Sequence, residues 1–79
     1  MSYTVQFRRR AANELKALPT GVRRTLAQVV EALAENPRPS GAEQLRGTEF
    51  LRVRVREYRV VYRVRDDVLL VLVITDRKP

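Results

Sequence analysis

The sequence contains no cysteine and no histidine, and each absence excludes a class of chemistry. Without cysteine the chain forms neither a disulfide nor a thiolate metal site, and no redox compartment is implied. Without histidine it lacks the commonest general base and the commonest metal ligand. The only aspartates are Asp66, Asp67 and Asp76, and nothing pairs them at a metal-binding spacing. We therefore expect neither a metal nor a cofactor.

Long apolar segments are also missing. The longest apolar run, Val68 to Ile74, is far shorter than the roughly 20 residues that a membrane-spanning helix requires. The first ten residues, MSYTVQFRRR, lack the apolar core of a secretory signal. At 79 residues the chain has the length of one small domain. We expect a single domain over residues 1–79, cytoplasmic and without membrane contact.

Acidic residues are scarce, since nine Asp and Glu face sixteen Lys and Arg for a net charge of +7. All but Lys16 and Lys78 of the basic residues are arginine, the residue best suited to planar, bidentate recognition of phosphate. A GC-rich genome would also enrich arginine, so composition alone leaves both explanations open. Position favours recognition, because seven arginines fall within residues 46–65. Such a basic face predicts an acidic partner, either nucleic acid or a negatively charged protein.

The basic residues follow a β-strand period in the segment FLRVRVR, residues 50–56. A period of two places successive side chains on opposite faces of a sheet. One face can then pack on a core while the other presents guanidinium groups about 7 Å apart. A row of cations at this spacing suits a polyanion with regularly placed phosphates. The apolar face would hold Leu51, Val53 and Val55, and the basic face Arg52, Arg54 and Arg56.

Arg59 lies in the following strand, where both faces carry apolar residues. An arginine at such a half-buried position requires either a carboxylate partner or a ligand. Glu57 and Asp67 are the candidate partners. The sequence leaves both explanations open.

The rest of the chain predicts an α+β fold. The last strand is apolar on both faces and should lie inside the sheet with both sides covered. Helix hairpin and strands together give the order β-α-α-β-β-β, with the two-helix hairpin packed on one face of a mainly antiparallel four-stranded sheet. The expected elements are a strand over 3–7, helices over 8–18 and 21–35 with Thr20 as N-cap of the second, an irregular but ordered connection over 36–49, and strands over 50–56, 58–64 and 68–75, with turns at Glu57 and at Asp66-Asp67.

The chain resembles the RelE/ParE superfamily of bacterial toxins from type II toxin–antitoxin modules. The resemblance begins with YTVQF, continues through A..EL..LP and VRRTLAQVVEALAENP, and is strongest in LRGTEFLRVRVREYRVVYRVRDDVLLVLVITDRK. It covers essentially the whole chain, so it implies one RelE-like toxin domain. It also implies a cognate antitoxin, with which the toxin forms a hetero-oligomer.

RelE-like members are ribosome-dependent endoribonucleases, so the resemblance implies a metal-independent attack of a ribose 2′-hydroxyl on the adjacent phosphate of mRNA. Preorganised guanidinium groups would stabilise the charge that develops on the phosphate oxygens. The ribosome, with its mRNA and rRNA, would be the partner in this reaction. The implied catalytic residues are Arg52, Arg54, Arg59 and Arg77, and the RNA-binding residues are Arg46, Arg56 and Arg63.

Two features of the sequence keep alternatives open. The RelE branch usually has a tyrosine beyond the Arg77 position, and this sequence stops at Pro79. Arginine cannot act as a proton acceptor, which leaves Glu57 or Tyr58 as candidates for that role. The alternatives are a ParE-like toxin that inhibits DNA gyrase and a catalytically inactive relic that only binds an antitoxin.

Overall fold

Two helices and five strands follow one another in the computed structural model, which describes residues 2–76. This order confirms the predicted α+β fold and adds one short strand, β2, inside the segment predicted to be irregular. A two-residue strand shows no periodicity, so the sequence could not reveal it. The elements are β1 (Thr4–Phe7), α1 (Arg9–Lys16), α2 (Thr20–Glu35), β2 (Glu43–Gln44), β3 (Phe50–Val55), β4 (Tyr58–Arg65) and β5 (Val68–Asp76).

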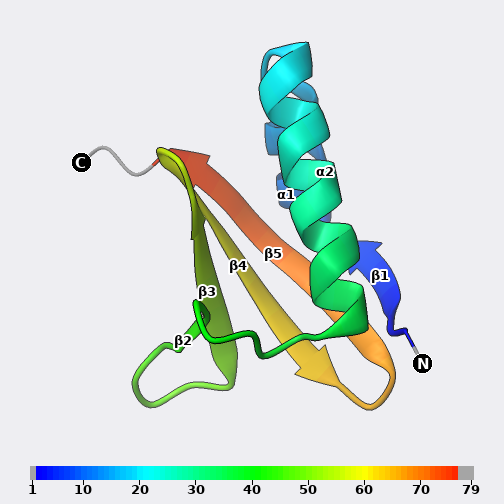
Figure 1. The fold of residues 1–79 in the computed structure, drawn as a ribbon, viewed down its shortest axis with the longest axis vertical. Helices are drawn as coiled ribbons and strands as arrows, with labels where there is room; N and C mark the ends of the chain where they lie inside the picture. Colours follow the sequence, from blue (N-terminus) through cyan, green and yellow to red (C-terminus); the bar gives the residue numbers. More distant parts are fainter. Residues whose placement is uncertain (1, 77–79) are drawn as a thin grey trace.

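The strands form one sheet in the order β1-β5-β4-β3-β2 (Figure 1). β1 runs parallel to β5, and every other neighbouring pair is antiparallel, which confirms the mainly antiparallel prediction. β5 lies between β1 and β4, an interior position that matches its continuous apolar sequence. The centre of the sheet is β4, which therefore carries its side chains across the middle of both faces.

A bulge interrupts the pairing of β4 with β5. Val61 lies opposite Val73 while its neighbour Tyr62 lies opposite Val71, so Leu72 is an extra residue on β5. Because of it, Val71 and Leu72 are both buried although they are adjacent in sequence. The extra residue also shifts the alternation of side chains along β5 by one. Leu70 and Val73 therefore point to the same side of the sheet although they are three residues apart.

Two tight turns join the last three strands, as predicted. Arg56 and Glu57 connect β3 to β4, and Asp66 and Asp67 connect β4 to β5. The first residue of each turn has a left-handed backbone, with φ of 58° at Arg56 and 56° at Asp66. Aspartate adopts this conformation more readily than a long side chain does. Arg56 therefore belongs to a strained turn and not, as the alternation suggested, to the strand.

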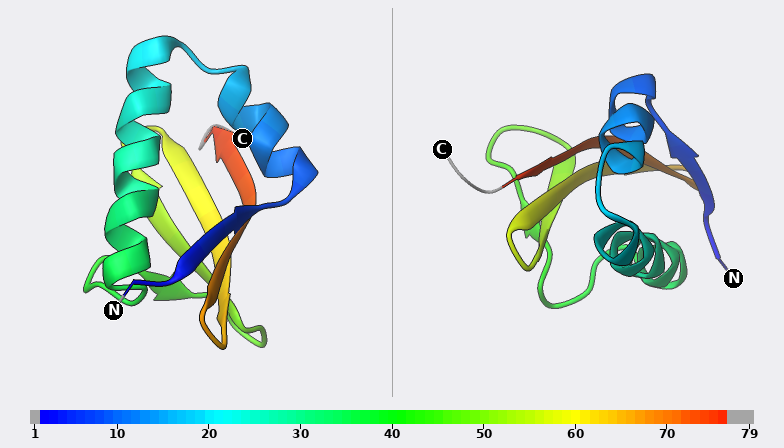
Figure 2. Two further views of the ribbon diagram at one scale, coloured as in Figure 1. Left: turned by 90° about the vertical axis from the view of Figure 1, so that its right-hand side faces the viewer. Right: turned by 90° about the horizontal axis from the view of Figure 1, so that it is seen from above.

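The helices form an antiparallel hairpin beside the sheet (Figure 2). They and the strands share one apolar core, which confirms that the helical pair packs on one face. Within residues 2–76, no helix has both the length and the apolar character needed to cross a bilayer. The core cluster consists of Ala11 from α1, Leu26, Val30 and Leu33 from α2, and Leu51, Val60, Tyr62, Leu69, Val71 and Ile74 from the sheet.

The start of α2 differs from the prediction, because Thr20 is not its N-cap. The cap position is Pro19, with φ −56° and ψ 152°, and no side chain caps the helix there. The proline ring fixes φ and lets the helix begin one residue earlier than a threonine cap would. The Thr20 hydroxyl instead accepts a hydrogen bond from Nη2 of Arg23, at 3.3 Å.

A hydrogen bond holds the connection after α2 against the central strand, β4. The hydroxyl of Tyr62, whose side chain is fully buried, donates a 2.6 Å hydrogen bond to the backbone carbonyl of Pro37. Burial also raises the pKa of Tyr62, which keeps the hydroxyl protonated as a donor. This contact holds the chain in place as it leaves α2, as expected for an ordered connection.

Candidate nucleic-acid interface

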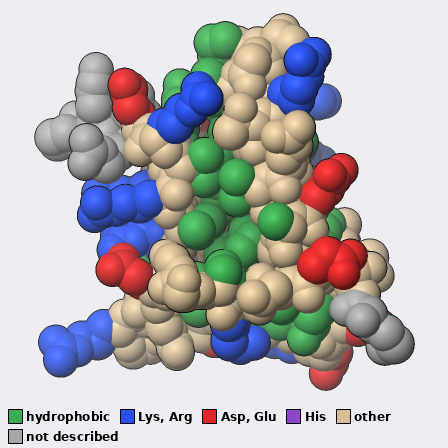
Figure 3. Space-filling model, in the orientation of Figure 1, with side chains coloured by type: hydrophobic (Ala, Val, Ile, Leu, Met, Phe, Trp, Pro, Cys, Tyr) green, Lys and Arg blue, Asp and Glu red, His purple; other side chains and the backbone are tan. Residues whose placement is uncertain are grey.

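The sheet has one face turned away from the core cluster, called here the open face. Val53 and Val55 of β3 and Tyr58 of β4 pack against the core from the other face. Because side chains alternate along a strand, the residues between them point to the open face. In Figure 3, basic side chains gather at the β3 side of the molecule, away from α2. The alternation of β3 therefore places its arginines as the sequence predicted.

Arg54 and Arg59 lie directly opposite each other on β3 and β4, and Arg59 in turn lies opposite Thr75 on β5. Directly opposed residues have Cβ atoms about 5 Å apart, a separation at which like charges destabilise a sheet. An anion bound between the two guanidinium groups would remove this repulsion. The pair is therefore arranged for binding a negatively charged group.

Three arginines of the open face have a buried, unpaired nitrogen. The Nε atoms of Arg52, Arg59 and Arg63 are shielded from solvent and have no hydrogen-bond partner among residues 2–76. A buried donor without a partner costs about 1–3 kcal/mol and calls for an explanation. Neither Glu57 nor Asp67 pairs with Arg59. Of the two explanations that the sequence left open for Arg59, the structure favours a ligand.

A carboxylate also lies among these arginines. Oε1 of Glu43, on β2, accepts a 2.6 Å hydrogen bond from Nη2 of Arg52, directly across the strand pair. This hydrogen bond and the charge of Arg52, with smaller effects from Arg54 and Arg59, lower the pKa of Glu43 below its ordinary value. The Glu43 side chain is 63% exposed, against 25% for Arg52, so its carboxylate can move away while the arginine stays.

Glu43 is a site residue that the sequence interpretation missed. It lies in the segment predicted to be irregular, nine residues before the arginine that it contacts. One signal was available, since Glu43 is the only acidic residue between Asn36 and Thr48 and it precedes a strand of arginines. A hollow beside this ion pair is lined by Gly41, Glu43, Arg52, Val53 and Arg54.

The other predicted site residues are distributed over several places. Arg63 lies on the open face of β4, four residues beyond Arg59, while Arg56 is exposed in the β3–β4 turn. Arg46 is exposed in the loop between β2 and β3, which lies at the Phe50 end of β3 and away from Arg54. Arg77 lies outside the described residues. The structure thus brings together Arg52, Arg54 and Arg59 and places Arg63 on the same face farther along β4, but it does not bring Arg46 or Arg56 to this group.

Neither candidate for a proton acceptor lies in this group. Tyr58 packs against the core cluster and therefore points to the face opposite Arg59. Glu57 is exposed in the β3–β4 turn. Glu43 is the carboxylate that accompanies the arginines, and a carboxylate can accept a proton from a hydroxyl group. The open face can therefore hold a phosphate between guanidinium groups and place a proton acceptor beside it.

Comparison with known proteins shows which family this sequence matches. The sequence model of the ParE toxin of the type II toxin–antitoxin system parDE matches residues 5–78. No curated protein sequence gives a significant match.

Solved structures of RelE proteins share the fold over nearly the whole chain. The intact E. coli RelBE toxin–antitoxin complex is 29% identical with a TM-score of 0.86, covering 99% of this chain and 100% of that one. The RelE–RelB complex of Pyrococcus horikoshii is 28% identical with a TM-score of 0.86, covering 98% and 97%. The isolated E. coli RelE toxin is 29% identical with a TM-score of 0.88, covering 99% and 87%.

Proposed function

The chain belongs to the ParE toxin family of type II toxin–antitoxin systems, within the RelE/ParE superfamily, and we propose that it acts by cleaving mRNA on the ribosome. One observation carries the proposal: Arg54 and Arg59 face each other on the open face, and the buried Nε of Arg59 has no partner in the part of the chain that the structure describes. This arrangement suits a phosphate group with charge developing on its oxygens. The similarity to RelE toxins supports the same activity.

In the proposed reaction, the 2′-oxygen of a ribose forms a bond to the adjacent phosphorus while the bond from phosphorus to the 5′-oxygen breaks. The products are a 2′,3′-cyclic phosphate and a 5′-hydroxyl. Arg54 and Arg59 stabilise the non-bridging oxygens, each worth about 2–4 kcal/mol of barrier by analogy with a single oxyanion donor. The proton of the 2′-hydroxyl goes to Glu43, and solvent or a ribosomal group protonates the leaving oxygen.

Glu43 changes its properties when a phosphate binds. In the free protein, hydrogen bonding and positive charge lower its pKa, which makes it a weak base. The largest cause, the hydrogen bond from Arg52, remains when a phosphate engages Arg54 and Arg59, but the phosphate offsets the smaller effects of these two charges and so raises the pKa of Glu43. The carboxylate therefore becomes a better proton acceptor when substrate is present.

The test is primer extension on mRNA from cells that express the chain, alongside an Arg54→Ala/Arg59→Ala double variant. We expect cuts within translated messages that are absent in the double variant. Arg24, an exposed residue of α2, provides a control, since Arg24→Ala changes the charge without touching the open face. Cleavage that survives in the double variant would contradict the proposal.

The second candidate function is inhibition of DNA gyrase without bond cleavage, and the match to the ParE family model favours it. In that case the arginines of the open face would bind a partner instead of stabilising a reaction. Growth arrest with a DNA-damage response and no mRNA cuts would select this function over the first.

For either function we propose a cognate antitoxin as the partner in a hetero-oligomer. The similar structures of E. coli and P. horikoshii are toxin–antitoxin complexes. The net charge of +7 favours an acidic segment laid over the basic residues. Such binding should weaken as salt is raised, and an affinity that is equal at low and high salt would contradict it.

A further inference from the structure

A second group of side chains occupies the open face at the other end of β4 from Arg54 and Arg59. Phe50 on β3 lies opposite Arg63 on β4, Arg63 lies opposite Leu70 on β5, and Leu70 lies opposite Gln6 on β1. The four residues form one line across four strands, called here the distal row. The row thus places side by side an aromatic ring, a guanidinium group, an apolar side chain and an amide.

The burial pattern places this row on the open face. Phe50 precedes Leu51, which is only 5% exposed in the core, so Phe50 points away from the core. Phe50 and Leu70 are half-buried but do not belong to the apolar residues that pack against the core cluster. Gln6 is exposed. The ring of Phe50 is therefore available beside the arginines instead of filling the interior.

Arg63 lies between the aromatic ring and a hollow in the surface. Its Nε is buried without a hydrogen-bond partner, whereas its neighbour Arg65 forms an ion pair with Glu49. The guanidinium group of Arg63 is thus available to a ligand, whereas that of Arg65 is already paired with Glu49. The hollow is lined by Gln6, Arg63, Arg65, Asp66, Val68 and Leu70.

We propose that the distal row is a subsite for one nucleotide of a single-stranded RNA, a proposal that rests on the function proposed above. The base stacks on Phe50, the phosphate binds Arg63, and the Gln6 amide offers both a donor and an acceptor to the edge of the base. Arg59 and Arg63 are four residues apart on one strand, which is about 13 Å. Since a stacked strand rises about 3.4 Å per nucleotide, the subsite lies at most about four nucleotides from the cleaved phosphate.

The chemistry of the row favours RNA over an acidic protein segment. A protein carboxylate would be satisfied by guanidinium groups alone and would be indifferent to the aromatic ring. Single-stranded nucleic acid is bound by proteins through basic residues combined with an aromatic ring on which a base stacks. Phe50 beside Arg63 provides this combination, and the amide of Gln6 adds a group that can distinguish bases.

The test measures the binding of fluorescently labelled single-stranded RNA octamers to the full chain at low ionic strength. Probes are used intact and with one abasic position moved along the strand. The variants are Phe50→Leu and Arg63→Gln. The matched controls are Phe7→Leu, which changes the exposed phenylalanine of β1, and Arg24→Gln on α2.

We expect Phe50→Leu to weaken binding at least about fivefold, as loss of base stacking does, and Phe7→Leu to leave it unchanged. An abasic position at the subsite should weaken binding to the original chain by the same factor and should have no further effect on Phe50→Leu. Phe50→Tyr keeps the ring and should keep the affinity, which separates stacking from any loss of folding. Thermal unfolding of each variant verifies that it is folded.

Other results would overturn the subsite. If the Arg54→Gln/Arg59→Gln variant loses binding while Phe50→Leu and Arg63→Gln do not, the subsite is wrong and the proposed function stands. If Arg63→Gln weakens binding but no abasic position does, the row contacts a phosphate and not a nucleotide. If the original chain binds RNA no better than the Arg54→Gln/Arg59→Gln variant and Phe50→Leu has no effect, the subsite is wrong, and the proposed cleavage on the ribosome is judged separately by primer extension.

Discussion

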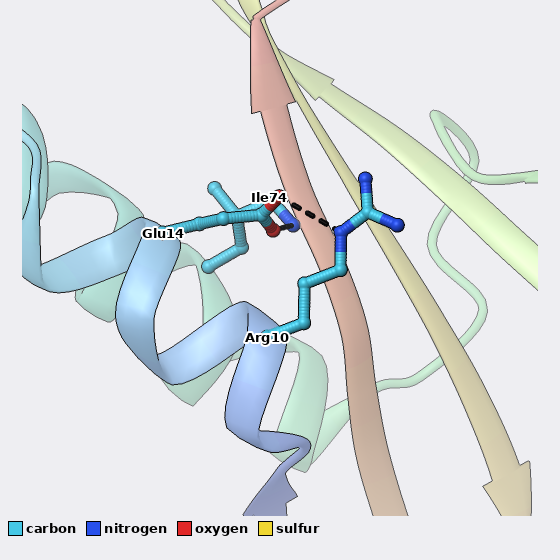
Figure 4. Close-up of polar contacts among 3 residues, drawn as sticks. All are labelled: Arg10, Glu14 and Ile74. Atoms are coloured by element: carbon cyan, nitrogen blue, oxygen red, sulfur yellow. Dashed lines mark hydrogen bonds and ion pairs between the residues drawn. The ribbon is translucent and has the colours of Figure 1, made fainter.

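The carboxylate of Glu14 joins a helix to a strand that follows 60 residues later in the chain (Figure 4). Its Oε1 accepts a 2.8 Å hydrogen bond from the backbone N–H of Ile74, and its Oε2 accepts a 3.0 Å hydrogen bond from Nε of Arg10. The last pair between β1 and β5 is Phe7 with Val71, so β5 continues beyond its neighbour. The Glu14 carboxylate thus supplies the hydrogen-bond acceptor for the Ile74 amide at a point where β1 no longer pairs with β5.

Replacing Glu14 should therefore destabilise the fold. Glu14→Ala leaves the part-buried amide of Ile74 without an acceptor, which costs about 1–3 kcal/mol. Urea denaturation measures the loss. Glu31→Ala, an exposed site on α2, is the control and should change stability little. Glu14→Gln keeps an acceptor oxygen and should lose less than Glu14→Ala, so equal losses in the two variants would contradict this role for the hydrogen bond.

Periodicity predicted the order of every element except β2, because the other helices and strands are long enough to show their period. The alternation of apolar residues with arginine in β3 assigned both faces correctly, since only one register packs Leu51 and Val53 against the core. The bulge at Leu72 could not be predicted, because β5 is apolar on both faces and a one-residue shift leaves its pattern unchanged.

The candidate site was predictable in its arginines but not in its carboxylate. Arg52, Arg54 and Arg59 stood out because cations recur at strand spacing in a half-buried segment. Glu43 depends on a tertiary contact made by a two-residue strand, which has no periodicity, and its isolated negative charge before the arginine strand was the only local signal. Thr20, the first residue of α2, was misassigned as its N-cap because Pro19 holds the extended cap backbone without a side-chain hydrogen bond.

Arg54→Gln should stabilise the protein while reducing its toxicity. The variant removes a like charge directly opposite Arg59, which favours the folded sheet by up to about 1 kcal/mol. It also removes one donor to the phosphate, which should lower the rate of mRNA cleavage about 100-fold or more. Chemical denaturation and primer extension measure the two effects. Arg24→Gln makes the same charge change on α2 and should alter neither the stability nor the cleavage rate. A loss of stability in Arg54→Gln would contradict the repulsion between Arg54 and Arg59.

Arg56→Gly should stabilise the β3–β4 turn. Arg56 has a φ of 58°, which is strained for a residue with a long side chain and unstrained for glycine. After subtraction of the entropy that glycine loses on folding, we expect a gain of about 1 kcal/mol in the free energy of unfolding. Asp66→Gly, at a φ of 56°, is the comparison and should gain less, because aspartate tolerates this region.

The same Arg56 variant separates strain from RNA binding. If the arginine contacts RNA, as the sequence predicted, Arg56→Gly weakens toxicity although it stabilises the fold. If toxicity is unchanged, the strained arginine is not part of the interface. A loss of stability in Arg56→Gly would contradict the account of the turn itself.

Glu43 should make the stability of the protein depend on pH in the acidic range. Its pKa in the folded protein lies below the ordinary value of 4.5, chiefly because of the hydrogen bond from Arg52. On acidification the unfolded chain therefore takes up a proton at this residue before the folded chain does. The stabilisation by Glu43 is fully present above pH 4.5 and is lost as the pH falls through its lowered pKa.

Comparison with Glu43→Gln isolates this contribution, because the amide does not titrate. The difference in unfolding free energy between the two proteins should be constant at neutral pH and shrink below pH 4.5, as measured by urea denaturation at a series of pH values. In an Arg52→Gln background the largest cause of the shift is gone, so the same comparison should depend less on pH. A pH dependence that is unchanged by Arg52→Gln would show that this ion pair does not set the pKa of Glu43, and would remove the basis for its behaviour as a proton acceptor controlled by the arginines.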